Sequence, residues 1–557
     1  MEAGGKYVLA ELTGKKAPDA GIIASVNMIQ IPTRAPAPLS WRRFLTTLCI
    51  AASVAATPVH SAPVPLKQLP DNSRLPTLGD PVREDLSPVI ERKLGEEIMR
   101  DIRRDRDFLD DDPILDYLNN FGAGLVNSVP DARGETNSDY YFFAVRDPML
   151  NAFALPGGFV AVHSALLIAA QTESELASVL SHEIGHVSQR HIARMLGQQK
   201  QDVLLPLAAL VLAVLASKAG SDAAMGVLMG GQGLAVQRQL NFTRDAEREA
   251  DRVGFQIMGA AGFDTSGMVA FFKRLQTASR AYGEMPANLS SHPLTGERIA
   301  DIQARIREMP YRQRVDSVEF FLVRSRARVL QDETAQGRLD ARTAFEAQLA
   351  MQSRQQQAAG QYGLAFLALK QGDLAKARSW LDKARATMKP REGPVFSTGQ
   401  STSDGAAMFA GLALEIDLAP GQAATMVQQT VKDAEAAHQR FPLSRSIARQ
   451  YAEALIAAGK LEEAAVYLRD QVQQYREEPK LYDQLAKTYA AQGKLALQHM
   501  ALAESYVLSG ALPAAVDQLN FARKSKDVSF YDQAVIDARE RELQARQKDE
   551  KKDKKDN

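Results

Sequence analysis

The chain has 557 residues, of which 45% are hydrophobic and 24% charged, and its 67 basic residues balance 67 acidic ones. This length predicts two or three domains, and the composition is that of ordinary globular protein. Because the formal net charge is +0, the sequence carries no electrostatic signature of a nucleic-acid partner. The only cysteine, Cys49, lies in an apolar N-terminal run, so disulfides, thiolate metal ligands and a cysteine nucleophile are excluded from the rest of the chain.

Residues 1–62 are typical of an export signal and not of a folded domain. An arginine pair precedes the apolar run 44–56, which is short for a membrane span, and small residues follow it. This order predicts Sec-type export with cleavage near Ser61 or Ala62, and therefore a periplasmic protein of a Gram-negative bacterium. Since signal peptides stand at the N-terminus of the translated chain, we expect the true start at Met28.

The next segments predict a linker, helices and a small sheet, in that order. Residues 63–85 are rich in proline and polar side chains, as in an extended linker, and helical periodicity follows over residues 87–126. Residues 140–163 predict short strands, with a tight turn where the segment 151–158 ends in Pro-Gly-Gly. Such a sheet can hold a peptide substrate as an added strand, or it can be a purely structural hairpin.

A segment with the metal-binding pattern H-E-x-x-H follows this sheet. Residues 172–196 predict one helix that starts at a T-x-x-E capping box and carries His182, Glu183 and His186. Residues four apart share a helix face, so both imidazoles can point at one metal ion, with Glu183 beside it as a proton acceptor for the attacking water. On the order of one chain in a hundred contains this pattern by chance. Here, however, an apolar stripe indicates that the helix packs against a core.

The third metal ligand has two candidates. Hydrolytic zinc sites have three protein ligands and a water, and without cysteine the third must be His, Asp or Glu. The predicted helix 243–260 places Glu247 and Asp251 on one face at i, i+4. We therefore expect Glu247 to bind one Zn²⁺ per chain and Asp251 to accept the free ring N–H of a ligating histidine. Glu249, about 100° around the same helix, is a rival that spacing alone does not exclude.

Two further histidines are candidates for the same site. His191 follows His182 by nine residues on the same predicted helix, without the glycine break of the metzincin pattern, so we expect it to be a solvated helix residue. His292 stands beside a turn in the segment 290–299. Either His292 or Arg298 can act as a catalytic group that stabilises the tetrahedral oxyanion, or His292 can simply cap local structure.

A strongly apolar segment, residues 203–236, lies between the two predicted metal-binding helices. Its most apolar part is too short for a confident membrane span and contains Pro206. We expect a helical hairpin near the site. Burial is favoured over peripheral membrane contact because no basic flank anchors the segment at an interface.

The C-terminal half contains an internal repeat. The pattern G-x-L-x-x-A begins at Gly372, Gly459, Gly493 and Gly510, and the copy at Gly493 has Gln498 in place of alanine. Gly459 and Gly493 are 34 residues apart, which is the period of tetratricopeptide repeats. Each unit predicts a helix–turn–helix, and stacked units form a concave superhelix; an unrelated helical bundle is the alternative.

The metal-binding residues taken together resemble a known family. The residues that carry the resemblance are His182, Glu183, His186, Glu247 and Asp251. They are similar to the HtpX/CAAX-prenyl-protease family of gluzincin metallopeptidases, as are the segment 151–158 and the His-Pro-x-x-x-x-Arg segment that ends at Arg298. The signal peptide and repeats resemble the BepA-type periplasmic branch, so that the resemblance covers nearly all of residues 85–525.

The resemblance implies roles that spacing leaves open. It implies that Glu247 and not Glu249 is the ligand, and that His292 occupies the open zinc position and holds the enzyme latent. Inner-membrane members of the family carry clear transmembrane helices, which this sequence lacks, so their prenyl-protease activity is not implied.

The fold class that we expect is mainly α: a gluzincin-type zinc metallopeptidase domain with a small β-sheet, followed by an α-solenoid of tetratricopeptide repeats. The predicted order is the metallopeptidase domain at 86–310, connecting helices at 311–355, the repeat domain at 356–525, and a C-terminal helix with a charged, disordered tail at 526–557.

The implied function is a periplasmic zinc endopeptidase with a chaperone-like role. Its partners would be unfolded or misassembled outer-membrane proteins and their insertion machinery, recognised by the repeats. One alternative is a repeat-based scaffold or chaperone with a latent or structural zinc site. Another is a housekeeping peptidase for small peptides, which would not need residues 356–525.

Overall fold

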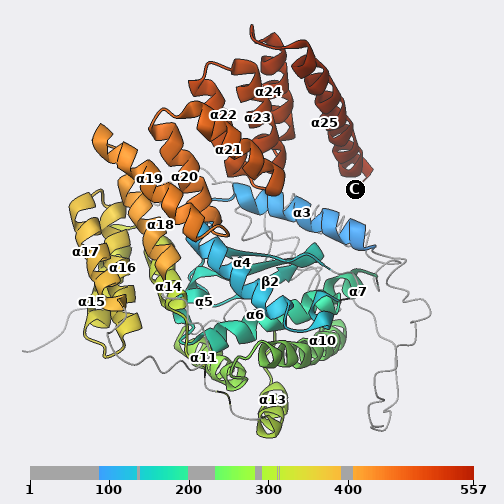
Figure 1. Ribbon diagram of the computed structural model, residues 1–557. Helices are drawn as coiled ribbons and strands as arrows, with labels where there is room; N and C mark the ends of the chain where they lie inside the picture. The colour runs from blue at the N-terminus through green and yellow to red at the C-terminus, as the bar shows by residue number, and fades with distance from the viewer. Residues whose placement is uncertain are drawn as a thin grey trace, which may run out of the picture. The chain divides into compact units, whose positions relative to one another are not determined.

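The computed structural model describes residues 87–134, 138–197, 232–282, 292–309, 312, 314–389 and 405–556. Helices dominate, and three strands form one small sheet, which confirms the predicted mainly α class (Figure 1). The predicted signal peptide, the start at Met28, the linker 63–85 and residues 203–231 of the predicted hairpin lie outside these residues. Among the described helices, none is both long enough and apolar enough to cross a membrane.

The first two described helices, α3 (Pro88–Arg104) and α4 (Asp112–Val126), begin with the same sequence signal. The side chains of Ser87 and Asp111 accept hydrogen bonds from backbone N–H groups of the first turns, at 3.3 and 3.2 Å. Each helix also has a proline in its first turn, where the missing N–H needs no partner. The capping residues therefore fix where both helices start.

The sheet has the strand order β1-β3-β2. Its strands are β1 (Tyr141–Val145), β2 (Ala152–Leu155) and β3 (Phe159–His163). β1 runs parallel to β3, and β2 runs antiparallel to it at the edge. The predicted Pro-Gly-Gly turn is confirmed as η2 (Pro156–Gly158), where φ of 76° at Gly157 and 91° at Gly158 suits only glycine comfortably.

Each face of the sheet packs against different helices, because side chains alternate along a strand. One face contributes to the main core with α4 and α6 (Glu173–Ser188) through Phe142, Ala144, Val160 and Val162. The other face packs against Met99 and Ile102 of α3 through Phe143, Val145, Phe159 and Ala161. The sheet thus lies between α3 and the helix that carries the H-E-x-x-H pattern.

Further helices complete this part of the chain. They are α5 (Ser164–Ala169), α7 (His191–Gly197), α10 (Gln232–Ala260), α11 (Ser266–Tyr282), α13 (Gly296–Glu308), α14 (Val318–Gln331) and α15 (Ala335–Leu349), with the short 3₁₀ helix η1 (Pro130–Arg133). α6 packs mainly against α10 and α11, and α14 packs against α5 and against α16 (Arg354–Lys370).

The C-terminal part that the structure describes consists of consecutive helices. They are α16 (Arg354–Lys370), α17 (Leu374–Met388), α18 (Ala406–Asp417), α19 (Ala424–Arg440), α20 (Arg445–Ala457), α21 (Leu461–Gln474), α22 (Pro479–Ala491), α23 (Leu495–Leu508), α24 (Leu512–Lys524) and α25 (Phe530–Asp556). All four repeat glycines have φ between 71° and 76°, in the left-handed region that a helix-ending turn uses. The alanines of the pattern, Ala377, Ala464 and Ala515, are fully buried. The assignment to tetratricopeptide repeats stays a prediction.

The C-terminal tail differs from the prediction. α25 continues to Asp556, over residues for which the sequence predicts a disordered tail. The physical reason is local: this segment has no glycine or proline and is rich in Lys, Glu, Gln and Arg, which are good helix formers.

α4 also contacts the repeat helices, because the carboxylate of its Asp116 binds two serines at the start of α20. Asp116 Oδ2 accepts hydrogen bonds from Ser444 Oγ at 3.0 Å and from the backbone N–H of Ser446 at 3.1 Å. Burial raises the pKa of this carboxyl to about 6, so the folded protein holds the proton more tightly than the unfolded chain does. The contribution of Asp116 to stability is therefore fully present below about pH 4 and is lost as the pH rises through about 6.

This linkage predicts the effect of Asp116→Asn, which keeps an acceptor oxygen for both serines but carries no charge. We expect the unfolding free energy of the variant minus that of the wild type to increase by about 1–2 kcal/mol from about pH 5 to about pH 7.5. Urea denaturation at each pH measures this difference. The control is Asp433→Asn, which changes an exposed aspartate of α19 and should show no such gain. A stability difference that is the same at both pH values would contradict the prediction.

Candidate metal centre

α6 begins as the sequence predicts. Its N-cap is Thr172, whose side chain accepts a hydrogen bond from the backbone N–H of Glu175 at 3.2 Å. Glu175 accepts in turn from the backbone N–H of Gln171 at 2.9 Å and pairs with Arg274 of α11 at 2.8 Å. Nearly all of α6 is buried, so the packing around it fixes where its histidines and Glu183 point.

α6 ends at Ser188, and the helix predicted to continue to residue 196 is interrupted. Arg190 adopts a left-handed conformation with φ of 51°, and α7 starts as a separate helix at His191. Non-glycine residues rarely adopt this conformation. Here the buried Arg190 Nε donates to Glu91 Oε2 of α3 at 3.2 Å, which holds the turn. The prediction of one continuous helix is therefore wrong.

α6 and α10 lie side by side and pack closely because each presents a glycine to the other's backbone (Figure 1). A Cβ atom at Gly185 would lie 2.9 Å from the carbonyl oxygen of Ala250. A Cβ atom at Gly254 would lie 2.9 Å from the backbone nitrogen of His182. Both distances are shorter than side chains tolerate, so the close approach requires glycine at both positions.

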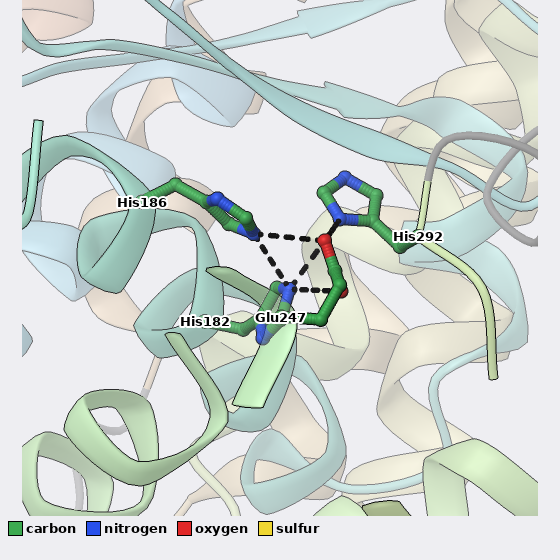
Figure 2. A group of neighbouring side chains, drawn as sticks. All are labelled: His182, His186, Glu247 and His292. Carbon is green, nitrogen blue, oxygen red and sulfur yellow. Dashed lines mark hydrogen bonds and ion pairs between the residues drawn. The ribbon is translucent and has the colours of Figure 1, made fainter. Parts of the chain in front are cut away.

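Four side chains from three segments converge beside this crossing, and we call them the metal-ligand cluster. They are His182, His186, Glu247 and His292, and their potential ligand atoms lie within 4.8 Å of one another (Figure 2). Glu247 Oε2 lies 3.3 Å from His182 Nε2, and its Oε1 lies 3.3 Å from His186 Nε2. Oε1 also lies 2.7 Å from His292 Nδ1. The Glu183 carboxylate borders the cluster, 3.6 Å from His292 Nε2.

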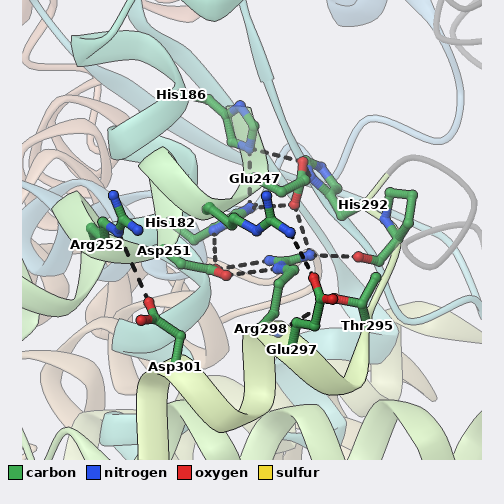
Figure 3. A network of polar contacts seen from close by, with 12 residues as sticks. His182, His186, Glu247, Asp251, Arg252, His292, Thr295, Glu297, Arg298 and Asp301 are labelled. Carbon is green, nitrogen blue, oxygen red and sulfur yellow. Dashed lines mark hydrogen bonds and ion pairs between the residues drawn. The ribbon is translucent and has the colours of Figure 1, made fainter. Parts of the chain in front are cut away.

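A second group of charges lies next to the cluster and supports it. Asp251 Oδ1 lies 3.0 Å from His182 Nδ1, the ring nitrogen that faces away from the other histidines. Arg298 of α13 donates to both oxygens of Asp251, at 2.6 and 2.8 Å, and lies 2.9 Å from Glu247 (Figure 3). Its Nη1 also donates to the carbonyl oxygen of Pro293 at 2.9 Å. Arg298 thus contacts the two carboxylates of α10 with all three of its guanidinium nitrogens.

His191 is buried, which contradicts the prediction of a solvated residue. Its Nδ1 lies 2.8 Å from His186 Nδ1, and its Nε2 lies 3.0 Å from Glu249, which also pairs with Arg194 at 2.6 Å. Glu249, the rival third ligand, therefore contacts His191 and not the metal-ligand cluster. The sequence gives no sign of this arrangement, because neither glycine nor proline marks the break before α7.

The comparisons with known proteins agree with this geometry. Residues 125–306 match peptidase family M48. The beta-barrel assembly-enhancing protease of Escherichia coli O157:H7 is 30% identical over 84% of this chain and 90% of its own length. The chain belongs to peptidase family M48. This confirms the predicted family and makes the protein a metalloprotease.

Other relatives point the same way. The beta-barrel assembly-enhancing protease of Yersinia pestis is 29% identical over 85% of this chain and 92% of its own length. The mitochondrial metalloendopeptidase OMA1 of Schizosaccharomyces pombe is 31% identical over 30% of this chain and 48% of its own length. The first of these relatives is similar to this chain along most of its length, and the second over a shorter part.

The charges of the M48 peptidase suit a cation at the metal-ligand cluster. Burial lowers the pKa of His186 to about 3 and keeps its imidazole neutral, the form that binds metal. Burial also lowers the pKa of His182, but Glu247 and Asp251 outweigh it and raise the value to about 10. Burial raises the pKa of Glu247, yet His292 and Arg298 hold it well below its ordinary value. The carboxylate is therefore ionised, and positive charge beside it is stabilised.

The donor set fits a metal ion as well. Two imidazoles and one carboxylate are ligands that hydrolytic metal sites use. Neither oxygen of the buried Glu183 carboxylate accepts a hydrogen bond from the described residues, so a polar partner such as water is needed there.

The contact between His191 and His186 leads to a prediction about metal affinity. His191→Phe fills a similar volume but cannot accept the N–H of His186, so the imidazole loses its orientation. We expect the affinity for metal to fall about 10- to 100-fold, measured by competition with a chromogenic chelator.

The matched control is His499→Phe, which changes a histidine of the repeat helix α23 and should leave the affinity for metal unchanged. If a folded His191→Phe variant binds metal as tightly as the wild type, the supporting role of His191 is wrong.

Proposed function

We propose that this M48 peptidase is a periplasmic zinc endopeptidase that acts on outer-membrane proteins during their assembly. The observation that carries the proposal is the convergence of His182, His186 and Glu247 with Glu183 beside them, in a chain of a metalloprotease family. The name of the relatives that match along most of the chain, beta-barrel assembly-enhancing protease, supports the link to assembly. The export signal expected in residues 1–62 supports the location.

His182, His186 and Glu247 would hold the zinc ion, with Asp251 orienting His182 and His191 orienting His186. When bound, zinc lowers the pKa of a water molecule and polarises the scissile carbonyl. Arg298 acts as a positioning residue for the two carboxylates of α10, because its guanidinium is occupied by them. This assignment replaces the alternative that Arg298 stabilises the oxyanion directly.

Glu183 acts as the general base. Its carboxylate takes a proton from the attacking water and passes it to the leaving amine. The absence of a hydrogen-bond donor to Glu183 among the described residues keeps both of its oxygens available for that water. β2, the edge strand beside α6, offers backbone groups to which an extended substrate can add as a further strand.

The repeat helices would recognise the partner proteins, namely unfolded or misassembled outer-membrane proteins and their insertion machinery. A stacked helical array gives a large concave surface that a compact peptidase domain lacks. Two other functions compete with this one. In a repeat-based scaffold or chaperone the zinc site is latent or structural, and a housekeeping peptidase for small peptides does not need residues 356–525.

Glu183→Gln tests the role of the base. The variant should bind zinc as the wild type does but cleave casein about 10²- to 10⁴-fold more slowly, because glutamine cannot take the proton. Zinc content by atomic absorption and casein cleavage are the measurements, and Glu297→Gln, at an exposed carboxylate on α13, is the control. Retained proteolysis would overturn the assignment. If Glu183→Gln fully corrected the cell-envelope defects of cells that lack this protein, the scaffold function would be favoured.

His292→Ala separates two roles of that histidine. We propose that His292 holds the enzyme latent, since its imidazole contacts Glu247 and lies beside Glu183, where a substrate carbonyl would approach. Removal of the imidazole should then speed casein cleavage at unchanged zinc content. If His292 stabilises the oxyanion instead, the same substitution slows cleavage about 10²- to 10³-fold.

A further inference from the structure

A polar cavity of about 880 Å³ lies against the repeat helices, and the turn before α4 borders it. These helices, together with α14, contribute five cationic side chains to its lining: Arg326, Lys370, Arg449, Lys480 and Lys487. They contribute three acidic side chains: Glu415, Glu453 and Asp483. The helices therefore give this basic cavity an excess of positive charge.

The excess is more than offset by the three aspartates of an acidic turn, residues 110–112, that belongs to the peptidase part of the chain. Arg326 Nε donates to both carboxylate oxygens of Asp111, at 2.7 and 2.8 Å. The other ion pairs of the turn include those of Asp110 with Lys480 and of Asp112 with Arg449. The acidic turn thus binds the cations of the cavity in the way that an acidic ligand from another protein would.

Lys480 and Arg449 need this negative charge. Burial lowers the pKa of Lys480, the neighbouring Arg449 lowers it further, and Asp110 opposes both effects. Burial lowers the pKa of Arg449 as well. Two neighbouring cations that are partly removed from water are stabilised by an adjacent anion. If the carboxylates of Asp110 and Asp112 withdraw, another anion is therefore favoured in their place.

The three aspartates of the turn are not equivalent. Asp111 is fixed, because it caps α4 and pairs with the buried Arg326. Asp110 is half-exposed, and neither Asp110 nor Asp112 supplies the cap. The carboxylates of Asp110 and Asp112 can therefore give way to those of another chain while α4 keeps its N-terminal cap.

We propose that the basic cavity binds an acidic segment of a partner protein, whose carboxylates compete with Asp110 and Asp112 for Lys480 and Arg449. The inference rests on the proposed role of the repeats in partner recognition and is independent of catalysis. A protein segment suits the cavity better than nucleic acid, because a phosphate backbone requires a continuous basic surface and this lining also contains carboxylates.

Binding of a partner in the basic cavity would affect the sheet through backbone hydrogen bonds next to the acidic turn. The backbone N–H of Leu109 donates to the carbonyl oxygen of Ala144 in β1 at 3.0 Å. The backbone N–H of Arg146, just after β1, donates to the carbonyl oxygen of Asp107 at 2.6 Å. A partner that displaces the carboxylates of Asp110 and Asp112 therefore acts next to the end of a strand in the same sheet as β2.

The test uses the full chain with Glu183→Gln, so that the probe is not cleaved. The probe is a fluorescein-labelled peptide with the sequence of residues 107–115, and binding is followed by fluorescence anisotropy. We expect saturable binding that weakens as salt is raised. Adding Asp110→Asn and Asp112→Asn should tighten binding about five- to tenfold, because two competing carboxylates are lost, and adding Lys480→Gln should weaken it about fivefold.

Matched controls use charged residues outside the basic cavity. Glu462→Gln with Glu463→Gln removes two exposed carboxylates of α21, and Lys494→Gln removes a cation that pairs with Glu462. Both control variants should bind the probe as the Glu183→Gln chain does. A peptide with asparagine in place of each aspartate should not bind.

Two results would overturn the inference. One is the absence of saturable binding to the chain that carries Asp110→Asn and Asp112→Asn. The other is equal affinity of the Lys480→Gln and Lys494→Gln chains for the probe. Casein cleavage by the chain with Glu183 intact is measured separately, so a failure of the peptidase assignment is distinguished from a failure of this binding site.

Discussion

The metal-ligand cluster depends on the close approach of α6 and α10. The ligands come from two helices, and Glu247 reaches His182 and His186 only because the two backbones touch where Gly185 and Gly254 lack side chains. A helix pair with ordinary side chains at the crossing is separated by about 8–10 Å between axes. The glycines thus set the size of the space that the four side chains enclose, and with it the kind of ligand that the space accepts.

Close packing of this kind brings two carboxylates of α10 into the interior, and their charge must be compensated. Arg298 supplies part of the compensation, because one guanidinium contacts both Glu247 and Asp251. An uncompensated buried charge costs several kcal/mol, so α13 is as necessary to the centre as the helices that carry the ligands. The interior of the site is therefore a network of opposite charges that a cation completes.

Features set by local spacing could be predicted from the sequence. The i, i+4 spacing of His182 and His186 fixes a common helix face, and the same rule applies to Glu247 and Asp251. The small sheet, its Pro-Gly-Gly turn and the glycine turns of the C-terminal helices also follow from local patterns.

Features set by distant partners could not be predicted. The left-handed Arg190 is held by Glu91, which lies 99 residues earlier, and without that turn His191 would not reach His186. The direction of Arg298 is likewise set by carboxylates on another helix. The end of α25 shows the opposite limit. Its run of charges predicts disorder, although most of its residues are lysine, glutamate and glutamine, which favour a helix.

The contacts of α4 have a consequence for the order of folding. Asp111 pairs with Arg326, 215 residues later, and Asp116 binds Ser446, 330 residues later. Contacts of such high sequence separation carry a large loop-closure entropy and form late. Because synthesis starts at the N-terminus, all the metal ligands have been made long before α20. The long-range contacts of α4 are therefore completed only when the C-terminal helices have been made, so this seam between the two halves of the fold is a property of the complete chain.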